Sequence, residues 1–283
     1  MAQTTLPFLE ESTPISHRTV PRPFLKWAGG KTQLLSHLVP LVPEFSGTYH
    51  EPFVGGGALF FALRPRNAIL CDENERLIRS YRGLRDHAED VIRRLRKCPY
   101  DKDFYLEQRE QVIDGASDLD VATWMIYLNR TGFNGLYRVN RRNQFNVPFG
   151  RHIRPLICDE INLRACANVL QRAQVLHDKF ESVEARAKKG DFVYFDPPYE
   201  PLSSTSNFTS YTSGGFGFES QRALRDLAVR LKDRGVRVMI SNSSADPIYA
   251  LYEKDFELHE VPAYRRINCR RDRRGQVKEL VIL

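Results

Sequence analysis

The sequence lacks the features that mark secreted, metal-binding and membrane proteins. Its five cysteines are scattered, without C-x-x-C or another paired spacing, which argues against a disulfide framework and a zinc site. No apolar run approaches membrane-spanning length, and the first twenty residues have neither the basic start nor the apolar stretch of a secretory signal. We therefore expect a reduced, cytoplasmic protein with no metal and no membrane partner, and a disordered tail over residues 1–20.

The charge of the chain favours a polyanionic partner. Among 283 residues, 42 are Lys or Arg and 35 are Asp or Glu, which gives a formal net charge of +7. The basic residues gather at 138–154 and 265–274, and a clustered excess is typical of a surface that binds nucleic acid. A basic face that is only solvated is the alternative at this point.

Apolar runs and glycine turns follow one another in the order of an α/β nucleotide-binding sheet. Strands are predicted at 49–53, 68–72, 174–176, 192–195, 236–240 and 279–283, and helices at 32–38, 58–63 and 221–234. The block 73–162 interrupts this order. It predicts helices at 77–95 and 122–128, then a basic hairpin with arms at 133–139 and 145–150. We expect a mostly helical domain inserted into a sheet domain.

The tetrapeptide Asp196-Pro197-Pro198-Tyr199 directly follows one predicted strand. Proline fixes its own φ and pushes the preceding residue toward extended geometry, so the Asp196 carboxylate and the adjacent carbonyls are held in place. Two acceptors can then face one amino group, while the Tyr199 ring offers a flat face for a heterocycle. The motif predicts a pocket for the exocyclic amine of a base taken out of a duplex.

A glycine loop at 55–57 and Asp72 at the end of the following strand suit an adenosine-bearing cofactor. Glycines let the backbone approach the ligand, and the acid can accept from both ribose hydroxyls. A dinucleotide site fits nearly as well, although Phe60 replaces the last glycine of G-x-G-x-x-G. The segment 29–32 looks like half a phosphate loop, but Leu25 stands where the Walker pattern requires glycine.

Together these segments resemble the DNA adenine-N6 methyltransferases of the Dam type, the D12 class or alpha group with a DPPY motif. The resemblance runs in order from about residue 23 to residue 283. The DPPY tetrapeptide occurs in several amino-methyltransferase groups, whereas F-L-K-W-A-G-G-K at 24–31 and F-N-V-P-F-G at 145–150 are much narrower motifs.

The resemblance implies a class I, Rossmann-like S-adenosylmethionine-dependent methyltransferase. Residues 21–72 and 163–283 would form the cofactor-binding catalytic domain, and 73–162 the target-recognition domain that carries the β-hairpin. The implied activity is methylation of N6 of a flipped adenine in double-stranded DNA, favouring GATC. A monomer in the cytoplasm is expected, and a cognate restriction endonuclease is a further partner that this family allows.

The same resemblance assigns roles to individual residues. Asp196, Pro197, Pro198 and Tyr199 would form the catalytic pocket. The cofactor would contact Trp27, Ala28, Gly29, Lys31, Phe53, Gly55, Gly57, Asp72, Asp178, Phe180 and Asp196. Trp27 and Phe180 as plain core aromatics, and Asp178 as a helix N-cap, are the structural alternatives.

DNA would contact Lys26, Phe133, Asn134, Leu136, Arg138, Pro148 and Arg151. Arg138 is the leading base reader, because guanine presents two major-groove acceptors to a bidentate arginine. Phe133 would wedge into the duplex, and Arg151 would bind phosphates, which position the protein without specifying sequence. The hairpin departs from the family pattern at Tyr137, Val139 and 141–144.

Four other functions share part of this evidence. Cytosine-N4 and RNA adenine methyltransferases share the tetrapeptide and the glycine loop, but the F-N-G-L-Y-R arm of the hairpin argues for duplex DNA. A Rossmann dehydrogenase leaves Asp196–Tyr199 unexplained. A non-catalytic DNA-binding module would not need both a cofactor loop and an amine pocket. The polar segment 201–218 is expected to be a mobile loop over that pocket.

Overall fold

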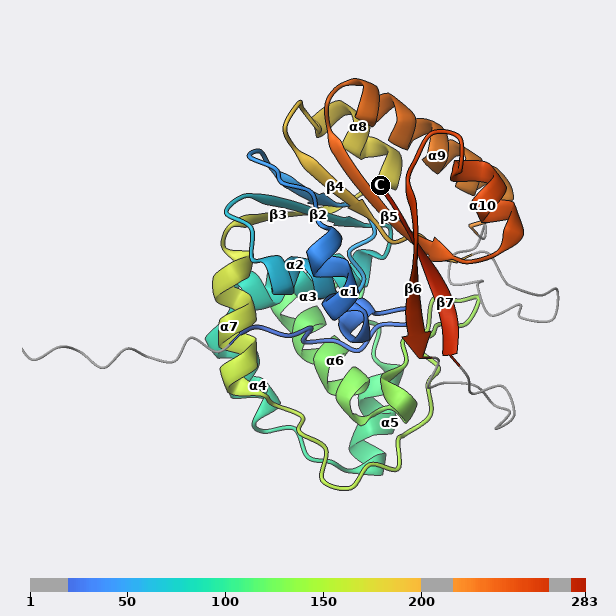
Figure 1. The fold of residues 1–283 in the computed structure, drawn as a ribbon. Helices are drawn as coiled ribbons and strands as arrows, with labels where there is room; N and C mark the ends of the chain where they lie inside the picture. The colour runs from blue at the N-terminus through green and yellow to red at the C-terminus, as the bar shows by residue number, and fades with distance from the viewer. Residues whose placement is uncertain (1–19, 200–215, 265–275) are drawn as a thin grey trace, which may run out of the picture.

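The strands form one seven-stranded sheet in the order β3-β2-β1-β4-β5-β7-β6 (Figure 1). The computed structural model describes residues 20–199, 216–264 and 276–283. The strands are β1 (Tyr49–Glu51), β2 (Ala68–Asp72), β3 (Ala173–His177), β4 (Phe192–Phe195), β5 (Arg237–Ser243), β6 (Leu258–Tyr264) and β7 (Gln276–Ile282). Strands β1 to β5 are parallel, and β7 is antiparallel to β5 and β6. The predicted α/β sheet is confirmed, and β6 is a strand that the sequence pattern did not predict.

The order of the strands reverses between β1 and β4. The chain builds β1, β2 and β3 outward in one direction and then returns to place β4 on the other side of β1. In open α/β sheets, ligands bind in the crevice outside the carboxyl ends of the strands at such a switch point. Glu51, Asp72 and Asp196 end or follow the three strands at this place, so the topology brings the predicted site residues to one edge of the sheet.

Helices cover both faces of the sheet (Figure 1). Along β4, Phe192 and Tyr194 belong to one hydrophobic cluster and Val193 and Phe195 to the other, as expected for a central strand buried on both sides. One face carries α8 (Val183–Arg186), α9 (Phe218–Asp233) and α10 (Asp246–Tyr252). The opposite face carries α1 (Leu35–Leu38), α2 (Ala58–Leu63) and α3 (Glu75–Asp86).

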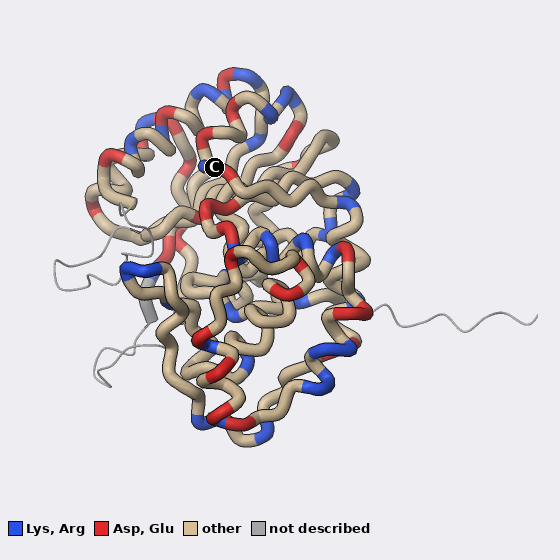
Figure 2. Tube along the Cα trace, turned by 180° about the vertical axis from the view of Figure 1, so that it is seen from behind, with Lys and Arg blue, Asp and Glu red and all other residues tan. Residues whose placement is uncertain are grey.

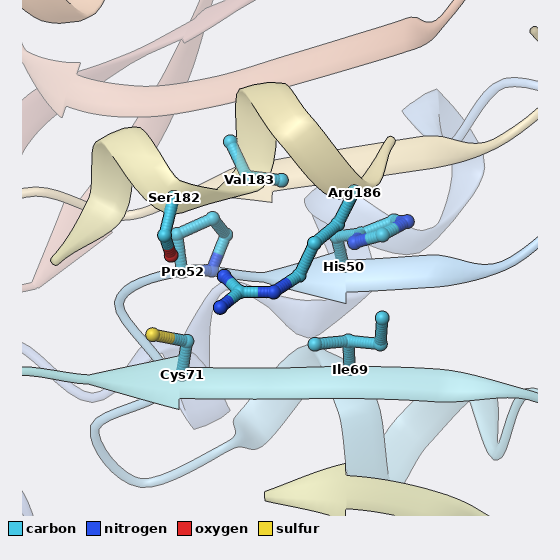
Figure 3. A pocket seen from close by; sticks show the side chains of 7 residues that line it. All are labelled: His50, Pro52, Ile69, Cys71, Ser182, Val183 and Arg186. Carbon is cyan, nitrogen blue, oxygen red and sulfur yellow. The ribbon is translucent and has the colours of Figure 1, made fainter. Parts of the chain in front are cut away.

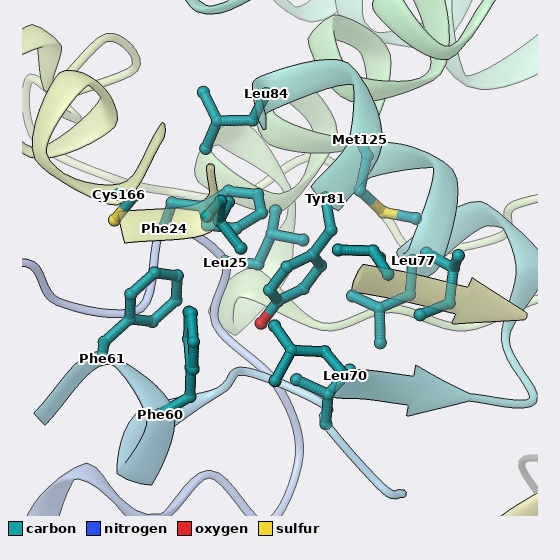
Figure 4. Close-up of a cluster of buried hydrophobic side chains, with 14 of the residues drawn as sticks. Phe24, Leu25, Phe60, Phe61, Leu70, Leu77, Tyr81, Leu84, Met125 and Cys166 are labelled. Atoms are coloured by element: carbon teal, nitrogen blue, oxygen red, sulfur yellow. The ribbon is translucent and has the colours of Figure 1, made fainter. Parts of the chain in front are cut away.

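The hydrophobic cluster on the α2 and α3 side runs without a break from the sheet into the helical block. Figure 4 shows Phe60 and Phe61 of α2, Leu70 of β2, Tyr81 of α3 and Met125 gathered in it. Helix α3 packs on β2 and β3 and also on α6 (Asp118–Thr131). The inserted segment therefore shares its core with the sheet, and its division into a separate domain stays an interpretation.

The single helix predicted over 77–95 is wrong, because two helices occupy this stretch. Helix α3 ends at Asp86, His87 has a non-helical φ of −135°, and α4 (Ala88–Leu95) follows. Glu89 and Asp90 in the first turn of α4 are the sequence signal of a new N-terminus. The remaining helices are α5 (Lys102–Glu110) and α7 (Glu160–Leu170), which were not predicted. In the described ranges no helix is long and apolar enough to span a membrane.

Residues 133–150, predicted as a hairpin, form a turn with irregular arms and no regular ladder. Only isolated bridges join Val139 to Phe145 and Gly132 to Phe149. Two backbone hydrogen bonds flank the turn, from Asn146 N to the carbonyl of Arg138 (3.0 Å) and from Asn140 N to the carbonyl of Gln144 (2.9 Å). Residues 133–135 form one 3-10 turn, so the arm predicted over 133–139 is not a continuous strand. We keep the name hairpin for residues 133–150.

We expect Gly83→Ala to destabilise the protein. A Cβ at this position of α3 would lie 2.1 Å from the carbonyl oxygen of Asp118 and 2.7 Å from the Cβ of Ala122 on α6, so the two helices would have to separate. Overpacking of this kind costs about 1–3 kcal/mol. Gly115→Ala is the matched control, because nothing lies within 4 Å of its added Cβ. Equal urea midpoints for the two variants would contradict the close helix crossing.

Candidate active site

The Asp196 carboxylate lies at the carboxyl end of β4 in contact with a buried lysine. The Nζ atom of Lys31 is 2.7 Å from Oδ1 of Asp196, and the Lys31 side chain is only 5% exposed. The same ammonium donates to the carbonyl of Gly29 at 2.6 Å and sits 4.6 Å from the centre of the Tyr199 ring. Oδ1 of Asp196 is buried against this ammonium. A carboxylate has about four lone-pair sites, and the Asp196 side chain is 18% exposed, so the group can still accept an incoming N–H.

Burial raises the pKa of Asp196 to about 6. The Lys31 ammonium acts against this rise, and the negative charge of Glu279 adds to it. Desolvation disfavours the charged form of a carboxyl, while a neighbouring cation favours it. Asp196 is therefore an anion at neutral pH that takes up a proton under mildly acidic conditions.

Two polar side chains from distant elements hold the Asp196–Tyr199 motif. The Tyr199 hydroxyl donates to Oε2 of Glu279 on β7 at 2.6 Å, and burial raises its pKa well above the ordinary value. Gln221 of α9 donates to the carbonyl of Pro198 at 3.1 Å and accepts from Asn242 at 2.9 Å. Pro197 is buried and Pro198 exposed. The sequence assigned no role to Glu279 or Gln221, because only the sheet and α9 bring them here.

The glycine loop closes around Asp72 at the end of β2. Gly55 N donates to Oδ2 of Asp72 (3.0 Å) and Asn74 N to Oδ1 (2.9 Å). Burial raises the pKa of Asp72 to about 6 in spite of these two bonds. Gly55 has φ +46°, and a Cβ there would be 2.8 Å from Cδ1 of Trp27. Glycine is required because the loop packs directly on the indole ring. We call Trp27, Gly55, Asp72 and Asn74 the cradle.

The other predicted cofactor contacts lie around the same loop. Phe53 stacks on Phe180 with ring centroids 5.3 Å apart. Asp178 N donates to the carbonyl of Asp72 at 3.3 Å, but its carboxylate is occupied by Arg186 at 2.7 Å and by Lys179 N at 2.9 Å. Ala28 and Gly29 are exposed, with Gly29 at φ +76°, and Gly57 caps α2 at φ +65°.

Lys26 lies beside the first arm of the hairpin. Asn129 accepts from Lys26 N at 2.8 Å and donates to the carbonyls of Lys26 and Gly135 at 2.9 and 2.7 Å. The Lys26 side chain crosses Gly135 so closely that a Cβ there would be 2.4 Å from its Cδ. The structure therefore places Lys26 next to Asn134 and Leu136, three predicted DNA contacts from two distant segments.

The remaining predicted DNA contacts are exposed. Phe133 is 48% exposed, and its N–H donates to the carbonyl of Pro148 at 2.9 Å. Arg138 donates through Nε to Oδ1 of Asn146 (2.7 Å) and through Nη2 to its carbonyl (2.9 Å). Two hydrogen bonds to one residue fix the plane of the guanidinium group. Arg151 follows the hairpin on the surface, without a contact that joins it to the other site residues.

Five arginines of the hairpin region have no acidic partner among the described residues. Lys and Arg are interspersed with Asp and Glu along the tube in Figure 2, and many helical arginines, such as Arg76 and Arg164, form ion pairs. Within residues 20–199, 216–264 and 276–283, no salt bridge engages Arg138, Arg141, Arg142, Arg151 or Arg154. Unpaired charges of one sign favour a polyanion.

A small pocket between α8 and strands β1 and β2 is distinct from this site (Figure 3). It is lined by His50, Pro52, Ile69, Cys71, Ser182, Val183 and Arg186. None of these is a predicted site residue, and His50 is already paired with Asp191 at 3.0 Å. In the described part of the chain, no cluster of three or more His, Cys, Asp or Glu side chains could hold a metal. Residues 1–19 of the predicted tail, residues 201–215 of the predicted loop over 201–218 and the basic cluster 265–274 lie outside the described residues.

Comparisons with known proteins agree on one family. The model of the D12 class N6 adenine-specific DNA methyltransferases matches residues 27–267. The type II methyltransferase M1.LlaDCHI of Lactococcus lactis subsp. cremoris is 44% identical, over 92% of this chain and 94% of its own. The type II methyltransferase M.MjaIII of Methanocaldococcus jannaschii is 39% identical (93% and 98%), and the DNA adenine methylase of Escherichia coli K12 is 35% identical (93% and 95%). The chain therefore belongs to the D12 class of N6 adenine-specific DNA methyltransferases.

Proposed function

We propose that the protein transfers the methyl group of S-adenosylmethionine to N6 of an adenine flipped out of duplex DNA, at GATC. The observation that carries this proposal is the Asp196 carboxylate at the end of β4, whose partner Lys31 also lies 4.6 Å from the centre of the Tyr199 ring. An acceptor and an aromatic face at one point suit a planar base with an exocyclic amine. Membership of the family supports adenine as that base.

The residues of the cradle fit S-adenosylmethionine. Gly55 leaves the loop without a side chain where it turns. Each oxygen of Asp72 accepts one backbone N–H, which leaves lone pairs for ribose hydroxyls. Phe53 and Phe180 supply an apolar wall. When bound, the cofactor supplies an electrophilic methyl group on its sulfonium sulfur.

Asp196 contributes positioning and electrostatic stabilisation. The N6 lone pair of adenine is delocalised into the ring, so the amine is a poor nucleophile. Acceptors at the Asp196 carboxylate and the Pro197 carbonyl would bind its N–H groups and favour the tetrahedral nitrogen of the transition state. Once methylated, the nitrogen is strongly acidic, and the Asp196 carboxylate, with a pKa of about 6, is placed to accept the proton.

We further propose that the hairpin reads the DNA. Arg138, with its guanidinium plane fixed by Asn146, would address a guanine in the major groove. The unpaired arginines nearby would bind phosphates, with residues 73–162 acting as the target-recognition unit. The names of two relatives as type II methyltransferases support a cognate restriction endonuclease as a partner. The protein itself would act as a monomer.

Methyl-labelled S-adenosylmethionine tests substrate and sequence together. The substrates are a GATC duplex, the same duplex with its first G replaced, a duplex of G·C pairs that offers cytosine but no adenine, and single-stranded RNA of the GATC sequence. We expect label on adenine N6 in the GATC duplex alone. Label in both adenine duplexes would reject the site but keep the chemistry. Label in cytosine or in RNA would move the protein to the cytosine-N4 or the RNA adenine alternative.

Activity should fall as pH drops through about 6. When the cofactor is saturating, kcat/KM for DNA reports the pKa of Asp196 in the enzyme–cofactor complex before DNA binds. Protonation of Asp196 removes the hydrogen-bond acceptor for the amine. Because Lys31 lowers the Asp196 pKa, Lys31→Met should move this acidic limb to higher pH. An acidic limb at the same pH in Lys31→Met would contradict the assignment.

The raised pKa of Asp196 also affects the pH dependence of stability. Because burial raises the pKa in the folded state, Asp196 contributes stability below its unfolded pKa, and this contribution is lost as pH rises through about 6.

A further inference from the structure

Tyr137 connects the hairpin to the cradle. Its ring stacks on Trp27 with centroids 5.3 Å apart and an interplanar angle of 23°. It also packs on Phe145 of the returning arm, 5.8 Å away. Trp27 in turn lies against Gly55. One tyrosine thus touches both the base of the hairpin and the ring on which the glycine loop rests.

The first turn of α3 joins the cradle on its other side. Asn74 donates its backbone N–H to Asp72 at 2.9 Å and caps α3 by accepting from Leu77 N at 3.0 Å. Burial raises the pKa of Tyr137, and the Arg76 guanidinium in this turn acts against the rise. Tyr137 and the cradle therefore share one helix turn as a neighbour.

A second path joins the tip of the hairpin to the same helix. Asn143 donates to Asp114 at 3.3 Å, and Asp114 holds Arg76 of α3 through two hydrogen bonds of 2.6 and 2.7 Å. The Arg76 guanidinium lies 5.6 Å from the centre of the Trp124 ring, which packs on Phe145 at 5.5 Å. The hairpin thus rests on the first turn of α3, which begins at the cradle.

Arg138 is the next residue after Tyr137. Tyr137 is half-buried and Arg138 is exposed, and because they are adjacent, a shift of the backbone at Tyr137 also moves Arg138. The arms are joined by isolated bridges and not by a regular ladder. Because few hydrogen bonds join the two arms, little resists a small shift of the hairpin. Occupancy of the cradle can therefore bias the position of the hairpin.

We propose that Tyr137 is a positioning residue that couples occupancy of the cofactor site to reading of the DNA by Arg138. A ligand in the cradle fixes Trp27, and through it the ring of Tyr137 that stacks on it. This inference rests on the proposed function, because it takes the cradle as the cofactor site and Arg138 as the base reader. Linkage makes the effect reciprocal: DNA must tighten cofactor binding by the same factor.

The test measures this coupling factor with S-adenosylhomocysteine, which cannot donate a methyl group, and a GATC duplex of about two helical turns. The Kd of the duplex is determined with and without S-adenosylhomocysteine, and the Kd of S-adenosylhomocysteine with and without the duplex. We expect a factor of about tenfold in the wild type, within the usual range of coupling, and less than about threefold in Tyr137→Leu. Tyr137→Phe, which keeps the stacked ring, should stay close to the wild-type factor.

Tyr100→Leu is the matched control. Tyr100 also supports the hairpin, by donating to the carbonyl of Gly150 at 2.6 Å and packing on Phe149 at 4.8 Å, but its contacts lie away from the cradle. It should keep the wild-type coupling factor whatever its DNA affinity. Unchanged coupling in Tyr137→Leu, or no coupling in a wild type that binds both ligands, would overturn the inference alone. A wild type that binds neither ligand would overturn the proposed function as well.

Discussion

Asp196→Asn should reduce methyl transfer by about a thousandfold or more while the protein still folds and binds cofactor. Loss of one preorganised group that stabilises a transition state typically costs 10²–10³ in kcat, and here the same carboxylate also orients the amine. The amide keeps the shape of the side chain but replaces one acceptor by a donor. Because Lys31 is buried against Asp196, loss of the Asp196 charge leaves the ammonium with neutral acceptors only, so some stability should be lost as well. Label transfer, cofactor titration and thermal melting measure the three properties.

Asp191→Asn is the control that separates chemistry from stability. Asp191 begins the segment that Asp196 ends, and it accepts from Thr48 N at 2.7 Å and Lys188 N at 2.9 Å. Burial raises the Asp191 pKa, but these bonds and His50 bring it below the ordinary value. We expect Asp191→Asn to lose about 1–3 kcal/mol of stability with kcat unchanged. Normal turnover in Asp196→Asn would reject Asp196 as the catalytic acceptor.

The parts of the fold that the sequence predicted are those with a local signal. Buried parallel strands read as short apolar runs, as at 192–195, and the glycine loop marks the first strand-to-helix turn. Strand β6 was not predicted, because the exposed residues Glu260 and Pro262 and the half-buried His259 break an apolar pattern at the sheet edge. The hairpin turn was predicted, but its arms were not regular strands, because Tyr137 and Phe145 are held by side-chain packing.

In the candidate site, too, only the residues with a local sequence signal were predicted. Asp72 and Asp196 were predicted because each is the last polar residue after an apolar run. The contact of Lys31 with Asp196 was not predicted, and neither was the bond from Tyr199 to Glu279. These pairs are distant in sequence and meet only when the strand order is known. The resemblance assigned Lys31 to the cofactor, and its ammonium also contacts the Asp196 carboxylate.

Arg138→Ala should weaken binding to the GATC duplex and relax its specificity. The two hydrogen bonds to Asn146 hold the guanidinium in one plane before DNA arrives, which lowers the ordering cost of a bidentate contact. A bidentate arginine–guanine pair contributes about 1–3 kcal/mol of discrimination. Binding to GATC should therefore fall by roughly five- to 150-fold, while binding to the duplex with its first G replaced changes little.

Arg151→Ala gives the contrast that tells base reading from phosphate binding. Arg151 is exposed and has no acidic partner among the described residues, which suits a phosphate contact. Its loss should weaken binding to both duplexes about equally and lower the salt dependence by about one unit of slope. Arg138→Ala should change the ratio of the two Kd values instead. Equal losses on both duplexes in Arg138→Ala would make Arg138 a phosphate contact and leave the base reader to another hairpin residue.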